Sequence, residues 1–127
     1  MVHAEKTKLD GVLLIKPPMF EDSRGWNAML FDEREYGEIF KAHGVEDLHF
    51  VKDDFSFSRK HVLRGLHGDD CTWKLISCMV GSFYLVVVNN TPGHPQYRQW
   101  TGLNLSEHNR WQVLVPAGFA NGHLVMS

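Results

Sequence analysis

The sequence predicts an all-β fold, a sandwich or a barrel with one short N-terminal helix. Two observations predict it. From Leu48 onward, short segments rich in β-branched and aromatic residues follow one another at close spacing, with turn residues between them. Only one stretch of the chain carries apolar residues at helical spacing. Many short strands at this rhythm indicate a sandwich or a barrel.

Length and composition indicate one globular domain over residues 1–127, with 43% hydrophobic residues and a formal net charge of −2. This charge gives no net attraction to nucleic acid or to a membrane surface, so we expect neither partner. No apolar run could span a bilayer, and the N-terminus does not resemble a signal peptide. Two cysteines, Cys71 and Cys78, are too few for a disulfide framework. We therefore expect a cytoplasmic protein.

The helix is predicted between residues 32 and 44. Asp32 and Glu35 have the spacing of a capping box, and Gly44 stands where a helix ends. Between these signals the apolar residues recur at helical spacing, namely Tyr36, Ile39 and Phe40.

The other ordered segments are predicted to be strands. Gly11–Ile15 opens the ordered chain, Trp26–Phe31 is the second strand, and residues 48–57 have strand-like composition. Further strands are expected at Val62–His67, Lys74–Val80, Phe83–Val88, Tyr97–Leu105, Trp111–Val115 and His123–Met126. Phe83–Val88 lacks clean alternation, which is typical of a strand buried on both faces of a closed barrel with a ligand cavity. A packed sandwich without a cavity fits the pattern equally well.

The segment Val62–Asp69 is the densest in chemically active residues. Arg64 and His67 lie three positions apart, so in a strand they point to opposite faces unless a bulge intervenes. Gly65 between them would permit such a bulge. His67 at the end of a strand is a candidate proton-transfer group. On this motif alone, a structural histidine is the better interpretation.

The segment Pro116–His123 is a turn that leads into a strand, with Asn121 and His123 near the junction. Metal-binding cupins place a ligand histidine after such a turn. Here the earlier motif adds only His67, and two imidazoles without further ligands make a poor zinc or iron site. A metal centre on His67 and His123 is therefore disfavoured, and we expect no metal.

Five segments in order resemble the dTDP-4-dehydrorhamnose 3,5-epimerase family, whose fold is the cupin-type jelly roll, a double-stranded β-helix. The segments are Phe20–Trp26, Leu63–His67, Lys74–Cys78, Trp100–Ser106 and Pro116–His123. Three details resemble a branch of the family that acts on nucleotide-linked 4-keto sugars other than the rhamnose precursor, such as GDP-linked heptoses. They are the His-Gly-Asp sequence after Leu66, the short step from there to Lys74, and the Asn-Gly-His sequence that ends at His123. The resemblance implies a homodimeric epimerase of a nucleotide-diphosphate 4-keto-6-deoxy sugar, at C3, C5 or both, in deoxysugar or surface-polysaccharide biosynthesis.

By this resemblance His67 is the catalytic base, and Lys74 and Arg64 stabilise the enolate that forms next to the ketone. Arg24 matches the family position that binds the nucleotide diphosphate, for which a guanidinium is well suited. No cofactor is implied, because the ketone of the substrate supplies the activation. Further substrate contacts are implied at Asp53 and Asp54, beside Lys52, and at Asn121 and His123.

Each of these residues also has an ordinary structural explanation. Taken singly, Arg24 and Arg64 are more often surface ion pairs, and Lys74 could extend along the ring of Trp73. Asp53 and Asp54 could cap a turn, and His123 could be a core residue with its hydrogen bonds satisfied. Only the joint order of the motifs favours catalytic roles.

The sequence also departs from the family pattern. Met29 stands where the family has a substrate-binding Glu, and Asn89 stands where it has an acidic residue. Asn121 replaces a His, and Lys52 and Asp54 replace an amide pair. These changes bear on the sugar and the nucleotide more than on the fold.

In the family, the Tyr acid and the Asp that orients the catalytic His lie beyond the position of Ser127. We therefore expect the 127 residues to be a fragment of a longer protein. Tyr84 and Tyr97 are the acids available within the chain, although neither matches the family position. The alternative function is a non-catalytic cupin that binds sugar nucleotides.

Overall fold

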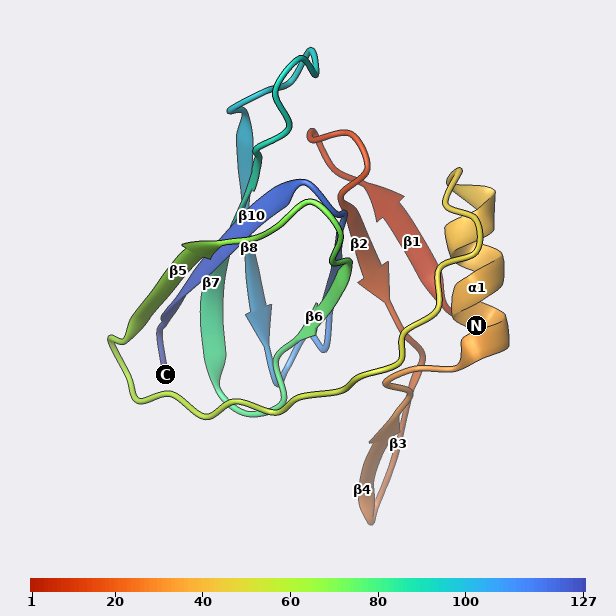
Figure 1. Cartoon of the computed structure of the whole chain (residues 1–127). Helices are drawn as coiled ribbons and strands as arrows, with labels where there is room; N and C mark the ends of the chain where they lie inside the picture. Colours follow the sequence, from red (N-terminus) through yellow and green to blue (C-terminus); the bar gives the residue numbers. More distant parts are fainter.

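Ten strands and one helix form two antiparallel four-stranded sheets that face each other, with a separate two-stranded hairpin (Figure 1). The computed structural model describes residues 1–127. The first sheet has the order β1 (His3–Lys6), β2 (Leu13–Lys16), β9 (Gln112–Val115) and β6 (Lys74–Ser77). The second has the order β5 (Leu63–His67), β10 (Phe119–Val125), β7 (Ser82–Asn89) and β8 (Trp100–Ser106). The predicted all-β jelly roll is confirmed.

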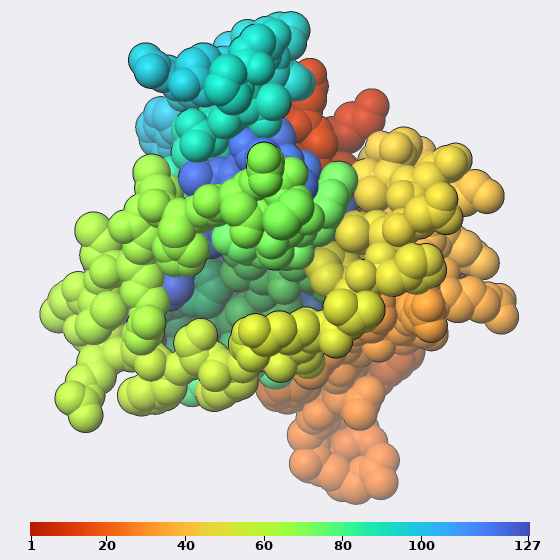
Figure 2. Space-filling model, viewed as in Figure 1, coloured from red at the N-terminus to blue at the C-terminus, as the bar shows by residue number.

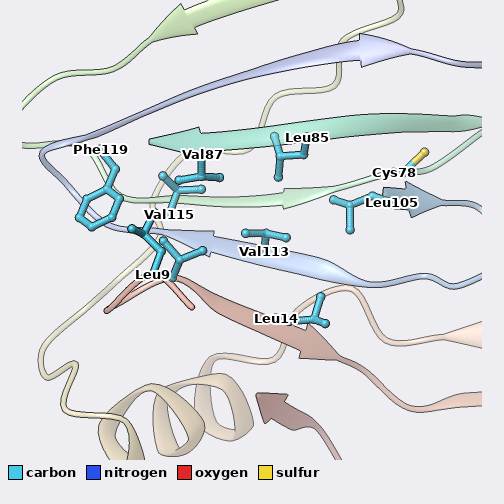
Figure 3. Packing of buried hydrophobic residues seen from close by; sticks show 10 residues of the cluster. Leu9, Leu14, Cys78, Leu85, Val87, Leu105, Val113, Val115 and Phe119 are labelled. Carbon is cyan, nitrogen blue, oxygen red and sulfur yellow. The ribbon is translucent and has the colours of Figure 1, made fainter. Parts of the chain in front are cut away.

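The main core lies between the two sheets (Figure 3). Aliphatic side chains of β2 and β9 meet those of β7 and β8 there, and each one fully buried contributes about 1.5–3 kcal/mol to stability. On β7, Leu85, Val87 and Asn89 are buried, whereas the residues between them are only partly covered. The strand is therefore buried on one face only, so the expectation of burial on both faces of Phe83–Val88 is wrong. Core side chains fill this part of the space between the sheets, as the packed alternative expects.

A second core lies on the other face of the first sheet, where helix α1 (Glu33–Ala42) packs. Tyr36 and Phe40 of the helix cover Leu13 and Ile15 of β2. The helix prediction is confirmed: the Asp32 side chain accepts a hydrogen bond from the backbone N–H of Arg34 at 3.0 Å, and Gly44 follows the last turn. The reciprocal Glu35 bond of a capping box is not formed. The helix is too short to cross a membrane.

The strand predicted at Gly11–Ile15 is confirmed, since it overlaps β2, but three other predictions for the N-terminal half are wrong. Ordered structure begins before Gly11, at β1, a polar edge strand without an apolar signal that pairs with β2. Instead of one strand at Trp26–Phe31, the hairpin pairs β3 (Met19–Asp22) with β4 (Gly25–Ala28). Residues 48–57 contain no strand, because their backbone makes no hydrogen bond to any neighbouring backbone. This extended segment crosses from α1 to β5 (Figure 1).

Candidate functional site

A bulge in β5 brings Arg64 and His67 to the same face of the second sheet. Asn121 of β10 lies opposite His67 and His123 lies opposite Arg64, so β5 has one residue more than β10 between the two pairs. Since Asn121 and His123 are two positions apart, they share a face, and their partners share it too. Gly65, with φ +112°, permits the bulge, because a Cβ there would strike the β10 backbone.

Lys74 joins this face from the opposite sheet. Its Nζ donates a hydrogen bond of 2.8 Å to Oδ1 of Asn121, a side chain that is only 6% exposed. Lys74 is the first residue of β6, whereas Asn121 lies in β10, so the bond crosses the interior between the sheets. The pair therefore fixes a positive charge beside the position of His67.

His123 lies between an aromatic ring and two basic groups. Its ring centroid is 5.0 Å from that of Phe83. Burial lowers the pKa of His123, and the charges of Arg64 and His67 lower it further. The imidazole of His123 is therefore held in its neutral form at neutral pH.

The guanidinium of Arg64 connects β5 to the extended segment. Its Nε donates to Ser58 Oγ at 2.7 Å, and its Nη2 donates to the carbonyl oxygen of Phe57 at 3.5 Å. In Figure 2 the surface is hollowed between the yellow-green extended segment and the green region that contains β5 and the loop to β6, and teal and blue atoms form its floor. These colours correspond to β7 and β10.

The structure does not bring Asp53, Asp54 or Arg24 to this cluster. Asp53 and Asp54 lie exposed in the extended segment, where Asp54 forms a 3.5 Å ion pair with Lys52. Arg24 lies in the turn of the β3–β4 hairpin and pairs with Asp22, and this hydrogen bonding lowers the pKa of the Asp22 carboxyl. The hairpin projects away from the sheets (Figure 1).

Two further candidates are also outside the cluster. Tyr84 lies opposite Leu124 and Asn104, on the outer face of the second sheet, with its ring over Gly102. It is therefore on the wrong face to serve as the acid. Tyr97 lies in the loop before β8, where Arg98 stacks on its ring. No three His, Cys, Asp or Glu side chains come together in a way that could hold a metal ion.

Sequence reasoning missed the role of Asp69 in the loop that joins His67 to Lys74. Its Oδ1 accepts hydrogen bonds from the backbone N–H groups of Cys71 and Thr72, and its Oδ2 accepts one from Thr72 Oγ1. These bonds lower the pKa of Asp69 to about 2. An Asp three positions before a Thr at a strand end is a turn signal that could have revealed this loop.

Comparison with known proteins identifies the family. The model of the dTDP-4-dehydrorhamnose 3,5-epimerase family matches residues 6–127. The chain belongs to this family. Its relatives include the dTDP-4-dehydrorhamnose 3,5-epimerases of Salmonella typhimurium, 36% identical over 100% of this chain, and of Methanothermobacter thermautotrophicus, 38% identical over 96%.

The solved structures of the family confirm the cupin jelly roll. The Legionella pneumophila dTDP-6-deoxy-D-glucose-3,5-epimerase, in complex with dTDP-4-keto-L-rhamnose, superposes with a TM-score of 0.91 at 36% identity. It covers 100% of this chain, and this chain covers 66% of it. The chain also spans 69% and 64% of the Salmonella and Methanothermobacter relatives, so it corresponds to about two thirds of a family member.

Proposed function

We propose that the protein is a cofactor-independent epimerase of a nucleotide-diphosphate 4-keto-6-deoxy sugar. One observation carries the proposal: the β5 bulge sets Arg64 and His67 on one face, where Asn121 holds the Lys74 ammonium. A base beside fixed cations is the arrangement that proton abstraction next to a ketone requires. Membership of the epimerase family supports the same chemistry. We place the reaction in the cytoplasm, where two free cysteines stay reduced.

In the proposed reaction His67 removes the proton from the carbon next to the C4 ketone. The C–H bond breaks, its electron pair moves into the new carbon–carbon double bond, and the ketone oxygen becomes an enolate. Lys74 and Arg64 stabilise that negative charge. A proton from water returns to the opposite face of the carbon, where the enolate double bond supplies the electron pair, and this inverts the configuration. The proton held by His67 passes to the solvent and restores the base. Asn121 and the neutral His123 serve as hydrogen-bonding contacts for the sugar.

The test is proton NMR of the full chain with a GDP- or dTDP-linked 4-keto-6-deoxy sugar in deuterium oxide. The C3 or C5 proton signal disappears as deuterium enters, and the signal that is lost identifies the carbon. His67→Ala abolishes the loss, whereas His108→Ala leaves it unchanged, because His108 lies on the surface beside Glu107. Unchanged exchange in His67→Ala would contradict the assignment of His67 as the base. Saturable binding by the wild-type chain without any exchange would favour the alternative, a non-catalytic protein that binds sugar nucleotides.

We also propose that the protein is a homodimer in which Arg24 serves the site of the other copy. Arg24 lies in the turn of the β3–β4 hairpin, which projects away from the two sheets (Figure 1). Apolar side chains near β5 and on the extended segment stay uncovered, which is typical of an interaction surface. The most exposed, between 72% and 93%, are Val51, Phe55, Phe57, Leu63 and Val80.

Mixing two impaired variants tests this arrangement, in assays at low substrate concentration, where weak binding of the diphosphate limits the rate. If Arg24 acts on the partner's site, a heterodimer of His67→Ala and Arg24→Ala chains contains one site with both native residues. Activity then returns on mixing, with a particle of twice the 14.6 kDa chain mass in light scattering. If Arg24 acted within its own chain, every site would lack one of the two residues and mixing would restore nothing. Asp53 and Asp54 lie outside the cluster, and we propose that they contact the substrate from the extended segment, whose later part Arg64 connects to β5.

A further inference from the structure

The hairpin that carries Arg24 has few contacts with the rest of the chain. Its two strands pair only with each other, and no hydrogen bond or ion pair joins β3 or β4 to another element. The hydrogen bonds of Arg24 all go to Asp22 within the same turn. The direction in which the hairpin presents Arg24 therefore depends on a small number of contacts elsewhere.

The start of β9 holds the base of the hairpin. Nε2 of the buried Gln112 donates a 2.8 Å hydrogen bond to the carbonyl oxygen of Leu30, just after β4. Nζ of Lys16, just before β3, lies 4.6 Å from the ring centroid of Trp111. Both contacts lie at the base of the hairpin, where the chain enters and leaves it. Contacts at the base alone do not fix the angle between the hairpin and the sheets.

A second point of attachment lies farther along the hairpin. The guanidinium carbon of Arg110 lies 4.3 Å from the ring centroid of Trp26, which is on β4 two residues after Arg24. Arg110 is itself held, because its Nη1 donates to the carbonyl oxygen of Met79 at 3.4 Å. The guanidinium that contacts Trp26 is therefore itself held in place. Together with the contacts at the base, this second contact fixes the direction in which the hairpin extends.

We infer that Arg110 is a positioning residue that stacks on Trp26 and so fixes the direction in which the hairpin presents Arg24. The effect on catalysis rests on the proposed function, in which Arg24 binds the diphosphate. We expect the diphosphate contact to be equally strong in the ground state and in the transition state, so that loss of the stack raises KM and leaves kcat unchanged.

The test compares Arg110→Gln with Arg98→Gln. The control is closely matched: Arg98 also has positive φ, 70° against 57° for Arg110, and it also stacks on an aromatic ring, that of Tyr97. Glutamine keeps the Cβ, Cγ and Cδ positions at both sites and removes the guanidinium group, and with it the cation over the ring. Uniform labelling with 5-fluorotryptophan gives fluorine signals, and Trp26→Phe identifies the signal of Trp26.

We expect Arg110→Gln to move the Trp26 fluorine signal, to accelerate amide exchange in residues 22–25 and to raise KM about two- to fivefold at constant kcat, the range for an exposed cation–π contact. Arg98→Gln changes none of these, and Arg110→Lys, which keeps the charge, recovers part of the KM. An unmoved signal and unchanged exchange would overturn the inference, as would a moved signal with unchanged KM. A wild-type chain without activity would instead count against the proposed function, while the fluorine signal and the amide exchange still decide whether Arg110 orders the hairpin.

Discussion

Lys74 and Asn121 connect the two sheets through a single side-chain hydrogen bond of 2.8 Å, from the first residue of β6 to the middle of β10. Asn121 is buried, so its Oδ1 has few other donors available. This bond holds the proposed enolate-stabilising ammonium at a fixed position in the interior of the jelly roll.

Replacing Asn121 with Leu should therefore lower both stability and activity. Loss of the acceptor leaves the half-buried ammonium without its partner, at a cost of about 1–3 kcal/mol in the free energy of unfolding. Urea unfolding of Asn121→Leu, Lys74→Met and the double variant measures the coupling between the two residues. Additive effects of the two substitutions would contradict a direct interaction.

Asp69 should control the order of the loop between His67 and Lys74. Asp69→Ala removes three hydrogen bonds, so the amides of Cys71 and Thr72 exchange faster and the deuterium-exchange rate of the substrate falls by up to about a hundredfold. Asp70→Ala is the control, because the Asp70 carboxylate makes no hydrogen bond. Equal effects of the two substitutions would refute a specific role for Asp69.

The pKa of Asp69 also predicts an acid transition in this loop. Because the pKa is lowered from 3.8 to about 2 in the folded state, the stabilisation is present above pH 3.8 and is lost as the pH falls through about 2. The amide signals of Cys71 and Thr72 followed by NMR should titrate with a midpoint near 2. A midpoint near 3.8 would mean that the carboxylate does not bind the loop in solution.

His123 should make the protein less stable in mild acid. Its pKa is lowered below 6.5 in the folded state, so the unfolded state binds a proton first as the pH falls. The contribution of His123 is favourable above pH 6.5 and is lost as the pH drops toward the lowered pKa. His123→Phe keeps a ring against Phe83 and should reduce the slope of stability against pH between 7 and 5, as measured by urea unfolding. An unchanged slope would assign the effect to other histidines.

Gln112 should be among the residues least tolerant of substitution. It accepts a 2.6 Å bond from the Tyr36 hydroxyl and donates to Leu30 and Ser77 from a fully buried position. Gln112→Leu leaves all three partners unsatisfied and should cost about 3 kcal/mol or more, whereas Tyr36→Phe, which removes one bond, should cost about 1 kcal/mol. Thermal unfolding of both variants checks this order, and equal losses would contradict it.

The sequence alone determined the features that local signals specify. The helix was found because a cap, apolar spacing and a terminal glycine agree, and the later strands were found because turn residues separate β-branched segments. The family was found because five motifs keep their order. Among the N-terminal strands, β2 was found from its apolar run, whereas β1 was missed, since β1 is polar and its pairing with β2 is the only reason for its conformation.

The tertiary structure decided which candidates share a site. Arg64 and His67 share a face only because β5 bulges against β10, and sequence spacing allowed either outcome. The same register assigns Tyr84 to the outer face. Arg24 belongs to the family motif, yet it does not join Lys74. The motif specifies only the type of residue, whereas its position is decided by the β3–β4 hairpin, which pairs with neither sheet and projects away from both (Figure 1).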